Sequence, residues 1–195
     1  MHLIHRLLGG RRPLRSNGFL ARLARDTRGL AAVELALIAP VMIAAYFGMA
    51  EVSMAMMAHR RASHAAAAVG DLVTQSVSMN DATITDIFSI GTTMMRPFDT
   101  APLKMRVTSV KMDASNNIKV VWSKTTGGMA AQVAGTTIVN ADLSALMAPN
   151  QSMVITDMGY QFTSPFQRAL PDALNFSDTT YLKPRKSDEV VWSTS

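Results

Sequence analysis

Residues 28–58 read RGLAAVELALIAPVMIAAYFGMAEVSMAMMA, and this stretch decides how the rest of the chain is organised. After Arg28, its only charged side chains are Glu34 and Glu51. A helix over the 29 residues from Leu30 to Ala58 would be about 43 Å long, whereas the hydrocarbon core of a membrane is about 30 Å thick. We therefore predict a single transmembrane helix over residues 30–58.

The residues before this helix are strongly basic. Residues 1–29 contain seven arginines and one aspartate, a net charge of +6, whereas residues 30–195 sum to −1. Basic flanks stay on the cytoplasmic side and are attracted to anionic inner-leaflet lipid. We therefore predict a cytoplasmic leader over residues 1–29 with membrane lipid as a partner, and nucleic acid is not an expected partner. The apolar run is too long for a cleaved secretory signal peptide.

The helical pattern continues beyond the apolar stretch. The apolar run ends at His59-Arg60-Arg61, but the residues from there to Ser78 contain no proline. We therefore predict an extramembrane continuation of the helix over residues 59–79. Residues 80–195 then form one α+β domain. Asn80 is expected to cap a second, short helix that ends before Pro97 and lies on a sheet.

Alternating apolar residues predict an antiparallel sheet after the second helix. Residues 103–108 and 118–123 form a hairpin around a turn at 113–117, with Ile118, Val120 and Trp122 on one face. The change of phase between Val107 and Val110 indicates a β-bulge. A loop follows over residues 127–135, with further strands over 154–162 and 179–183. The C-terminal Trp192 is expected to dock on its own domain.

The residue content disfavours an enzyme. The chain has no cysteine and no histidine after His64, so the sheet domain cannot hold a Ser-His-Asp triad. His59 and His64 are five residues apart, which is off the spacing that places two metal ligands on one helix face. No catalytic site, metal or cofactor is expected. Acid-based catalysis by surface carboxylates is a weaker alternative.

Two carboxylates in an apolar helix suggest a specific role. Glu34 and Glu51 are 17 residues apart, about 26 Å along a helix, and a carboxylate in lipid costs free energy unless it is paired. Glu34 lies five residues after Gly29. A cut between Gly29 and Leu30 would create an amino group one helical turn away, close enough to pair with this or a neighbouring subunit's carboxylate.

The motif Gly29-Leu-Ala-Ala-Val-Glu34-Leu-Ala-Leu-Ile-Ala-Pro40, followed by Gly48 and Glu51, resembles the TadE-like (TadE/TadG) pseudopilins of tight adherence (Flp) pilus systems, in the type IV pilin superfamily. Leu35 departs from the family, which more often has Phe there. Later segments also have counterparts in this family: residues 72–75, 96–99, 120–123, 160–162 and 181–185.

The resemblance implies a pilin-like fold and a role in pilus assembly. A prepilin peptidase would cut after Gly29, leaving Leu30 as the first mature residue and Glu34 as the subunit-docking glutamate. The implied protein is a minor pseudopilin or assembly component, single-pass in the inner membrane, with a periplasmic domain that could enter an extracellular pilus. Its partners would be other pilins, pseudopilins and the inner-membrane assembly platform.

Other helix residues are candidates for packing between subunits. Pro40 removes a backbone donor and should bend the helix near Ala36, while Gly48 allows helices to approach closely. Glu51 is the third candidate residue for helix packing. The competing interpretation is an uncleaved, membrane-anchored periplasmic module that captures a partner, and the mass of the mature chain distinguishes the two.

Overall fold

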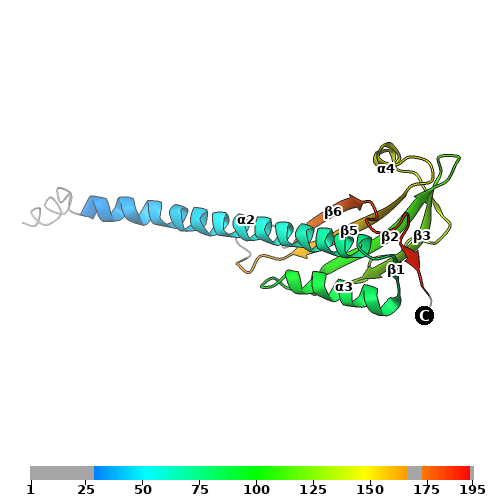
Figure 1. Cartoon of the computed structure of the whole chain (residues 1–195). Helices are drawn as coiled ribbons and strands as arrows, with labels where there is room; N and C mark the ends of the chain where they lie inside the picture. The colour runs from blue at the N-terminus through cyan, green and yellow to red at the C-terminus, as the bar shows by residue number, and fades with distance from the viewer. Residues whose placement is uncertain (1–28, 167–172, 194–195) are drawn as a thin grey trace, which may run out of the picture. The chain divides into compact units, whose positions relative to one another are not determined.

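A computed structural model describes residues 29–166 and 173–193 (Figure 1). The predicted leader lies outside these residues, apart from Gly29. The chain divides into two compact units, Met1–Ala45 and Tyr46–Ser195. Helix α2, Leu30–Thr74, contributes to both and is, among the described residues, the one helix long and apolar enough to cross a membrane. It ends at Thr74, five residues before the predicted boundary at residue 79, and Ser78–Met79 form a short strand instead.

The second unit contains a five-stranded antiparallel sheet in the order β4-β3-β2-β5-β6. Its strands are β2 (Leu103–Met112), β3 (Ile118–Thr126), β4 (Thr137–Ile138), β5 (Ser152–Phe162) and β6 (Leu174–Leu182). A separate parallel pair joins β1 (Ser78–Met79) to β7 (Val191–Trp192). The short helices are α3 (Asp81–Met94) and α4 (Ala141–Leu146). This arrangement confirms the predicted α+β, pilin-like fold.

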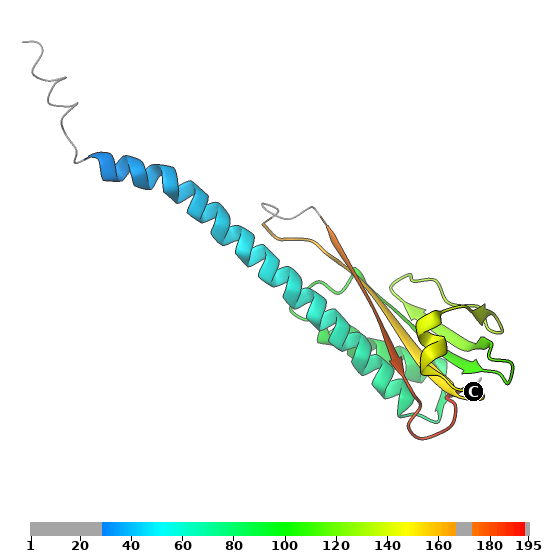
Figure 2. The ribbon, with the colours of Figure 1, turned by 90° about the horizontal axis from the view of Figure 1, so that it is seen from above.

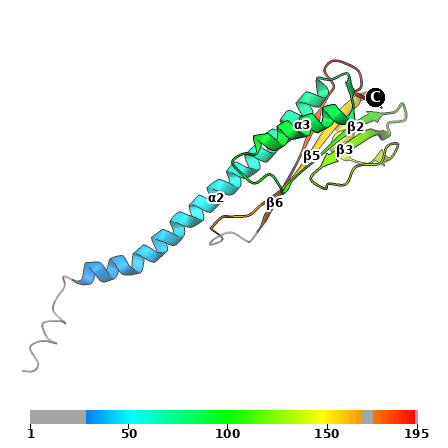
Figure 3. The same cartoon turned by 90° about the horizontal axis from the view of Figure 1, so that it is seen from below.

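Small side chains allow α2 to lie close to the sheet. Its buried stripe in the second unit includes Ala58, Ala62, Ala65, Ala66 and Val69. At Gly70, an added Cβ would lie 2.6 Å from Oγ1 of Thr156 on β5, so only glycine fits this crossing without movement. Figures 1 and 3 show α3 next to the C-terminal part of α2, and Figure 2 shows that part of α2 running beside the sheet.

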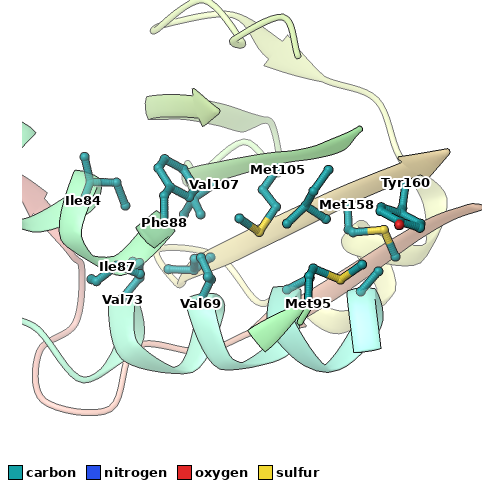
Figure 4. Packing of buried hydrophobic residues seen from close by; sticks show 14 of the residues in the cluster. Val69, Val73, Ile84, Ile87, Phe88, Met95, Met105, Val107, Met158 and Tyr160 are labelled. Carbon is teal, nitrogen blue, oxygen red and sulfur yellow. The ribbon is translucent and has the colours of Figure 1, made fainter. Parts of the chain in front are cut away.

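Helix α3 begins where the sequence predicts it. The Asn80 side chain accepts a hydrogen bond from the backbone N–H of Thr83 at 2.8 Å, which satisfies one of the free donors of the first turn. Its buried face, Ile84, Ile87 and Phe88, packs with Val69 and Val73 of α2 and with Met105, Val107 and Met158 of the sheet, as Figure 4 shows.

A bulge is present in β3 and not in β2, where the change of phase between Val107 and Val110 had indicated it, because β2 pairs with β5 without a register shift from Leu103 to Lys111. This bulge also corrects the predicted face of one tryptophan. Ser109 pairs with Trp122 whereas Val110 pairs with Val120, so Val121 is the extra residue in β3. Since one extra residue reverses the alternation, Trp122 joins the core beneath the helices, whereas Ile118 joins a second core with Val110 and Leu143 of α4. The prediction of one shared face for Ile118 and Trp122 was wrong.

The hairpin turn is organised by one carboxylate. Oδ1 of Asp113 accepts hydrogen bonds from the backbone N–H groups of Ser115 and Asn117, both at 2.9 Å, and Lys119 Nζ lies 3.1 Å from Oδ2. The Asn117 N–H, together with the Lys119 ammonium, lowers the pKa of Asp113. Asn116 takes a positive φ of 64° in this turn, a conformation that asparagine tolerates.

Candidate processing site and assembly helix

Gly29 and Leu30 form the exposed start of α2. Leu30 is the first residue of the α-helix, and its side chain is 57% exposed. Among the described residues other than its chain neighbours, no atom lies within 4 Å of the position that a Cβ at Gly29 would occupy. The local fold therefore has room for a side chain at position 29, and the glycine is not explained by packing.

Glu34 lies one turn into the same helix and is exposed. Leu30 and Glu34 are four residues apart, so they share one face of α2, about 6 Å apart along its axis. If the peptide bond before Leu30 were cut, the new amino group would lie at the start of this face. The helix thus carries the spacing needed to pair an amino terminus with a carboxylate.

The surroundings of Glu34 are apolar and uncovered. From Leu35 to Tyr46, every residue except Ala39 is exposed. The large apolar side chains among them are Leu35, Leu37, Ile38, Val41, Met42, Ile43 and Tyr46. A helix that is hydrophobic on all sides is normally buried in lipid or among other helices. This part of α2 therefore has the surface of a membrane anchor.

The structure separates the other predicted helix residues. Pro40 is exposed within a helix that continues through it, and Gly48 is half-buried. Glu51 is fully buried in the second unit, on the stripe that continues with Ala55 and Ala58. Glu34 is thus open to solvent or lipid, whereas Glu51 belongs to the interior of the domain. Sequence spacing treated the two carboxylates alike, because periodicity does not reveal which face a folded domain covers.

Arg61 is a structural contact that the sequence did not reveal. Its Nη1 donates to the carbonyl oxygen of Arg96 at 2.6 Å and to that of Met94 at 3.4 Å, across 35 and 33 residues of sequence. These carbonyls lie at the C-terminal end of α3, where a cation is favourable. The HRR tripeptide marked the end of the apolar run, but nothing local indicated this partner.

The described residues contain no group of three or more His, Cys, Asp or Glu side chains that could hold a metal ion. The His59 ring instead lies 4.8 Å from that of Phe176. What the described geometry of α2 offers is an exposed Gly29–Leu30 junction, a nearby carboxylate and an apolar helix surface.

Residues 29–71 match the family model described as TadE-like protein. Over this segment the chain is TadE-like. The match begins at the candidate cut site, includes Glu34 and Glu51, and ends three residues before the end of α2. It confirms the resemblance for the helix and does not extend to the sheet domain. No curated protein and no solved structure matches the chain.

A TadE-like segment of this kind indicates a protein associated with the Tad pilus. It likewise points to partners in the Tad pilus machinery. The long apolar helix at the N-terminal side agrees with a single membrane anchor.

Proposed function

We propose that this protein is a minor pseudopilin or assembly component of a tight adherence (Flp-type) pilus. The observation that carries the proposal is the TadE-like helix, which begins at an accessible Gly29–Leu30 junction and presents Glu34 on an uncovered apolar surface. A prepilin peptidase would cut after Gly29. The basic leader would stay in the cytoplasm, with α2 in the inner membrane and the sheet domain in the periplasm.

The proposed mechanism is charge pairing in a low-dielectric environment. Cleavage frees the amino group of Leu30, and an amino group and a carboxylate that are both in lipid are each costly when unpaired. Pairing of Leu30 with Glu34 of the same or a neighbouring chain removes that cost and sets the axial register between adjacent helices. Pro40 and Gly48 would let neighbouring helices follow and approach this surface.

The length of the chain favours a minor role. The second unit is a complete sheet domain joined to α2, far larger than the helix alone. The partners proposed here are a prepilin peptidase, other pilins and pseudopilins, and the inner-membrane assembly platform. An uncleaved anchor that uses its sheet domain to capture a partner is the competing function.

Intact mass of the membrane-extracted protein tests the proposal. A chain that has lost residues 1–29 supports the pseudopilin, whereas a chain that begins at Met1 in its native host supports the uncleaved anchor. Gly29→Leu should abolish the loss of mass. Because no atom crowds position 29, this change should leave the fold intact.

A matched control is Ala36→Leu, which adds similar bulk at an exposed site of the same helix, seven residues from the junction. It should be processed like the wild type. Normal processing of Gly29→Leu would contradict the cut site.

A further inference from the structure

Two loops meet at one end of the sheet in the second unit. Leu103 at the start of β2 pairs with Tyr160 near the end of β5, so the segments 95–102 and 163–166 emerge together. The Phe98 and Phe162 rings are 6.3 Å apart. We call these two segments the loop face. Figure 1 shows it at the opposite end of the sheet from the turn at 113–117.

The loop face borders the part of α2 that enters the second unit. The Phe166 ring lies 5.2 Å from that of Phe47, and Met54 lines a groove together with Phe98, Pro102 and Phe162. Phe166 is 42% exposed, and on α2 Met49 is 70% exposed. Exposed apolar side chains of α2 therefore lie next to exposed apolar residues of the loop face. These side chains remain exposed even though the second unit has a buried core of its own.

Positive charge surrounds this apolar surface. Arg60 and Arg61 of α2 and Arg96 of the loop face are exposed, and the hydrogen bond from Arg61 to the Arg96 carbonyl brings α2 and the loop face together. Within the described ranges, none of the three forms an ion pair with a carboxylate. The exposed acid here, Asp99, accepts a hydrogen bond from the backbone N–H of Ala101 at 3.0 Å. The ion pairs of the described residues thus involve other side chains, and the positive charge of these three guanidinium groups favours an anionic partner.

Helix length places this cluster at a definite depth. Thirty residues separate Leu30 from Arg60, about 45 Å of helix, which equals the roughly 40–45 Å thickness of a bilayer with its headgroups. If Leu30 begins at the inner surface, Arg60 reaches the outer headgroups. Basic residues at that depth meet lipid phosphates, and apolar loop residues meet the boundary of the acyl chains.

We propose that the loop face, together with Arg60, Arg61 and Arg96, binds anionic phospholipid headgroups of the outer leaflet in which α2 is embedded. Binding would hold the sheet domain against the membrane until the subunit is extracted. The inference rests on the membrane insertion contained in the proposed function. Each basic residue near such a surface contributes about a fivefold factor to the docking equilibrium.

A spin-label measurement on the full chain tests this binding. The chain has no cysteine, so Thr163→Cys introduces one labelling site on the loop face, and Ser115→Cys introduces one on the turn at the far end of the sheet. Each labelled chain is reconstituted in vesicles of phosphatidylcholine with or without phosphatidylglycerol. The Thr163 label should be shielded from a water-soluble nickel complex in the anionic vesicles, and the Ser115 label should not.

Charge variants identify the cause of the shielding. Arg60→Gln with Arg96→Gln should shift the docking equilibrium by about thirtyfold and expose the Thr163 label in anionic vesicles. Arg61 is left unchanged because it contacts α3. Lys186→Gln removes an exposed charge near the far end of α2 and should have no effect.

The outcomes separate this inference from the proposed function. If the nickel complex reaches both labels equally, the proposed lipid binding is wrong. If the same chain resists alkaline extraction from the vesicles, the insertion of α2 in the membrane is still supported. A chain that is extracted by alkali overturns insertion itself. Shielding that depends on the protein-to-lipid ratio and not on phosphatidylglycerol would indicate a second copy on this face and also overturns the proposal.

Discussion

Glu34 carries the most specific function proposed for a single residue. It is exposed on an apolar helix surface, one turn from the junction at which the mature chain would begin. A lone carboxylate there lowers the stability of the inserted helix, so its presence calls for a partner. The amino terminus that the proposed cleavage would create would provide one at the correct spacing.

Glu34→Gln should therefore uncouple processing from assembly. The variant keeps the helix and the cut site, but it cannot form the ion pair, and breaking a buried pair costs about 3–5 kcal/mol. We expect normal insertion and processing, with more than a tenfold fall in the amount of this chain in sheared filaments. Asp142→Asn, the same change at an exposed acid of α4, is the control. Undiminished incorporation of Glu34→Gln would argue against pairing.

At the scale of elements, α2 and α3 approach each other closely at Gly91. A Cβ added at Gly91 of α3 would lie 2.6 Å from Cγ2 of Val69 and 3.1 Å from Cε of Met105. The two helices and β2 therefore meet at a point where no side chain fits without movement. This contact fixes the distance between α3 and α2 above the sheet.

Gly91→Val should destabilise the domain through this contact. Overpacking of a close-packed core costs about 1–3 kcal/mol, which corresponds to a fall in melting temperature of several degrees for a chain of this size. Thermal unfolding of the detergent-solubilised chain measures the effect. Ser89→Val places the same β-branched side chain on the exposed face of α3 and should change the melting temperature much less. A similar effect from both variants would show that helix propensity, and not the contact, is responsible.

At the scale of the whole chain, the C-terminal segment ties the second unit together. Arg185 pairs with Asp71 near the end of α2 at 2.7 Å, and Glu189 pairs with Lys111 of β2 at 2.6 Å. The indole N–H of Trp122 donates to the carbonyl of Val190 at 2.7 Å within the core. The Trp192 ring lies 5.3 Å from that of Trp122, tilted by 51°, which confirms the expectation that it docks on its own domain.

Trp122→Phe tests the hydrogen bond that joins β3 to the C-terminal segment, from the Trp122 indole to the Val190 carbonyl. It removes the donor and leaves the buried Val190 carbonyl without its indole partner, a cost of about 1–3 kcal/mol. The melting temperature should fall by several degrees. Trp192→Phe is the matched control, because no hydrogen bond from its indole is present in the described part of the chain. Equal losses from the two variants would mean that ring packing outweighs the hydrogen bond.

Local patterns predicted most of the elements but not all of their partners. The Asn80 cap, the turn at Asp113 and the strand over 154–162 depend on neighbouring residues, and they appear as expected. The pairing of β1 with β7 and the short helix α4 were missed. Two-residue strands carry no periodicity, and their pairing depends on residues more than a hundred positions apart.

The sequence by itself determined that the protein has one membrane-length helix with a TadE-like junction and a carboxylate, Glu34, five residues after Gly29, because length, composition and helical periodicity are local properties. Tertiary structure alone decided that Glu51 is buried while Glu34 is open, that Trp122 faces the helices, and that Arg61 meets the end of α3. Each of these depends on which surface another part of the chain covers, and burial of that kind is created only when distant segments pack together.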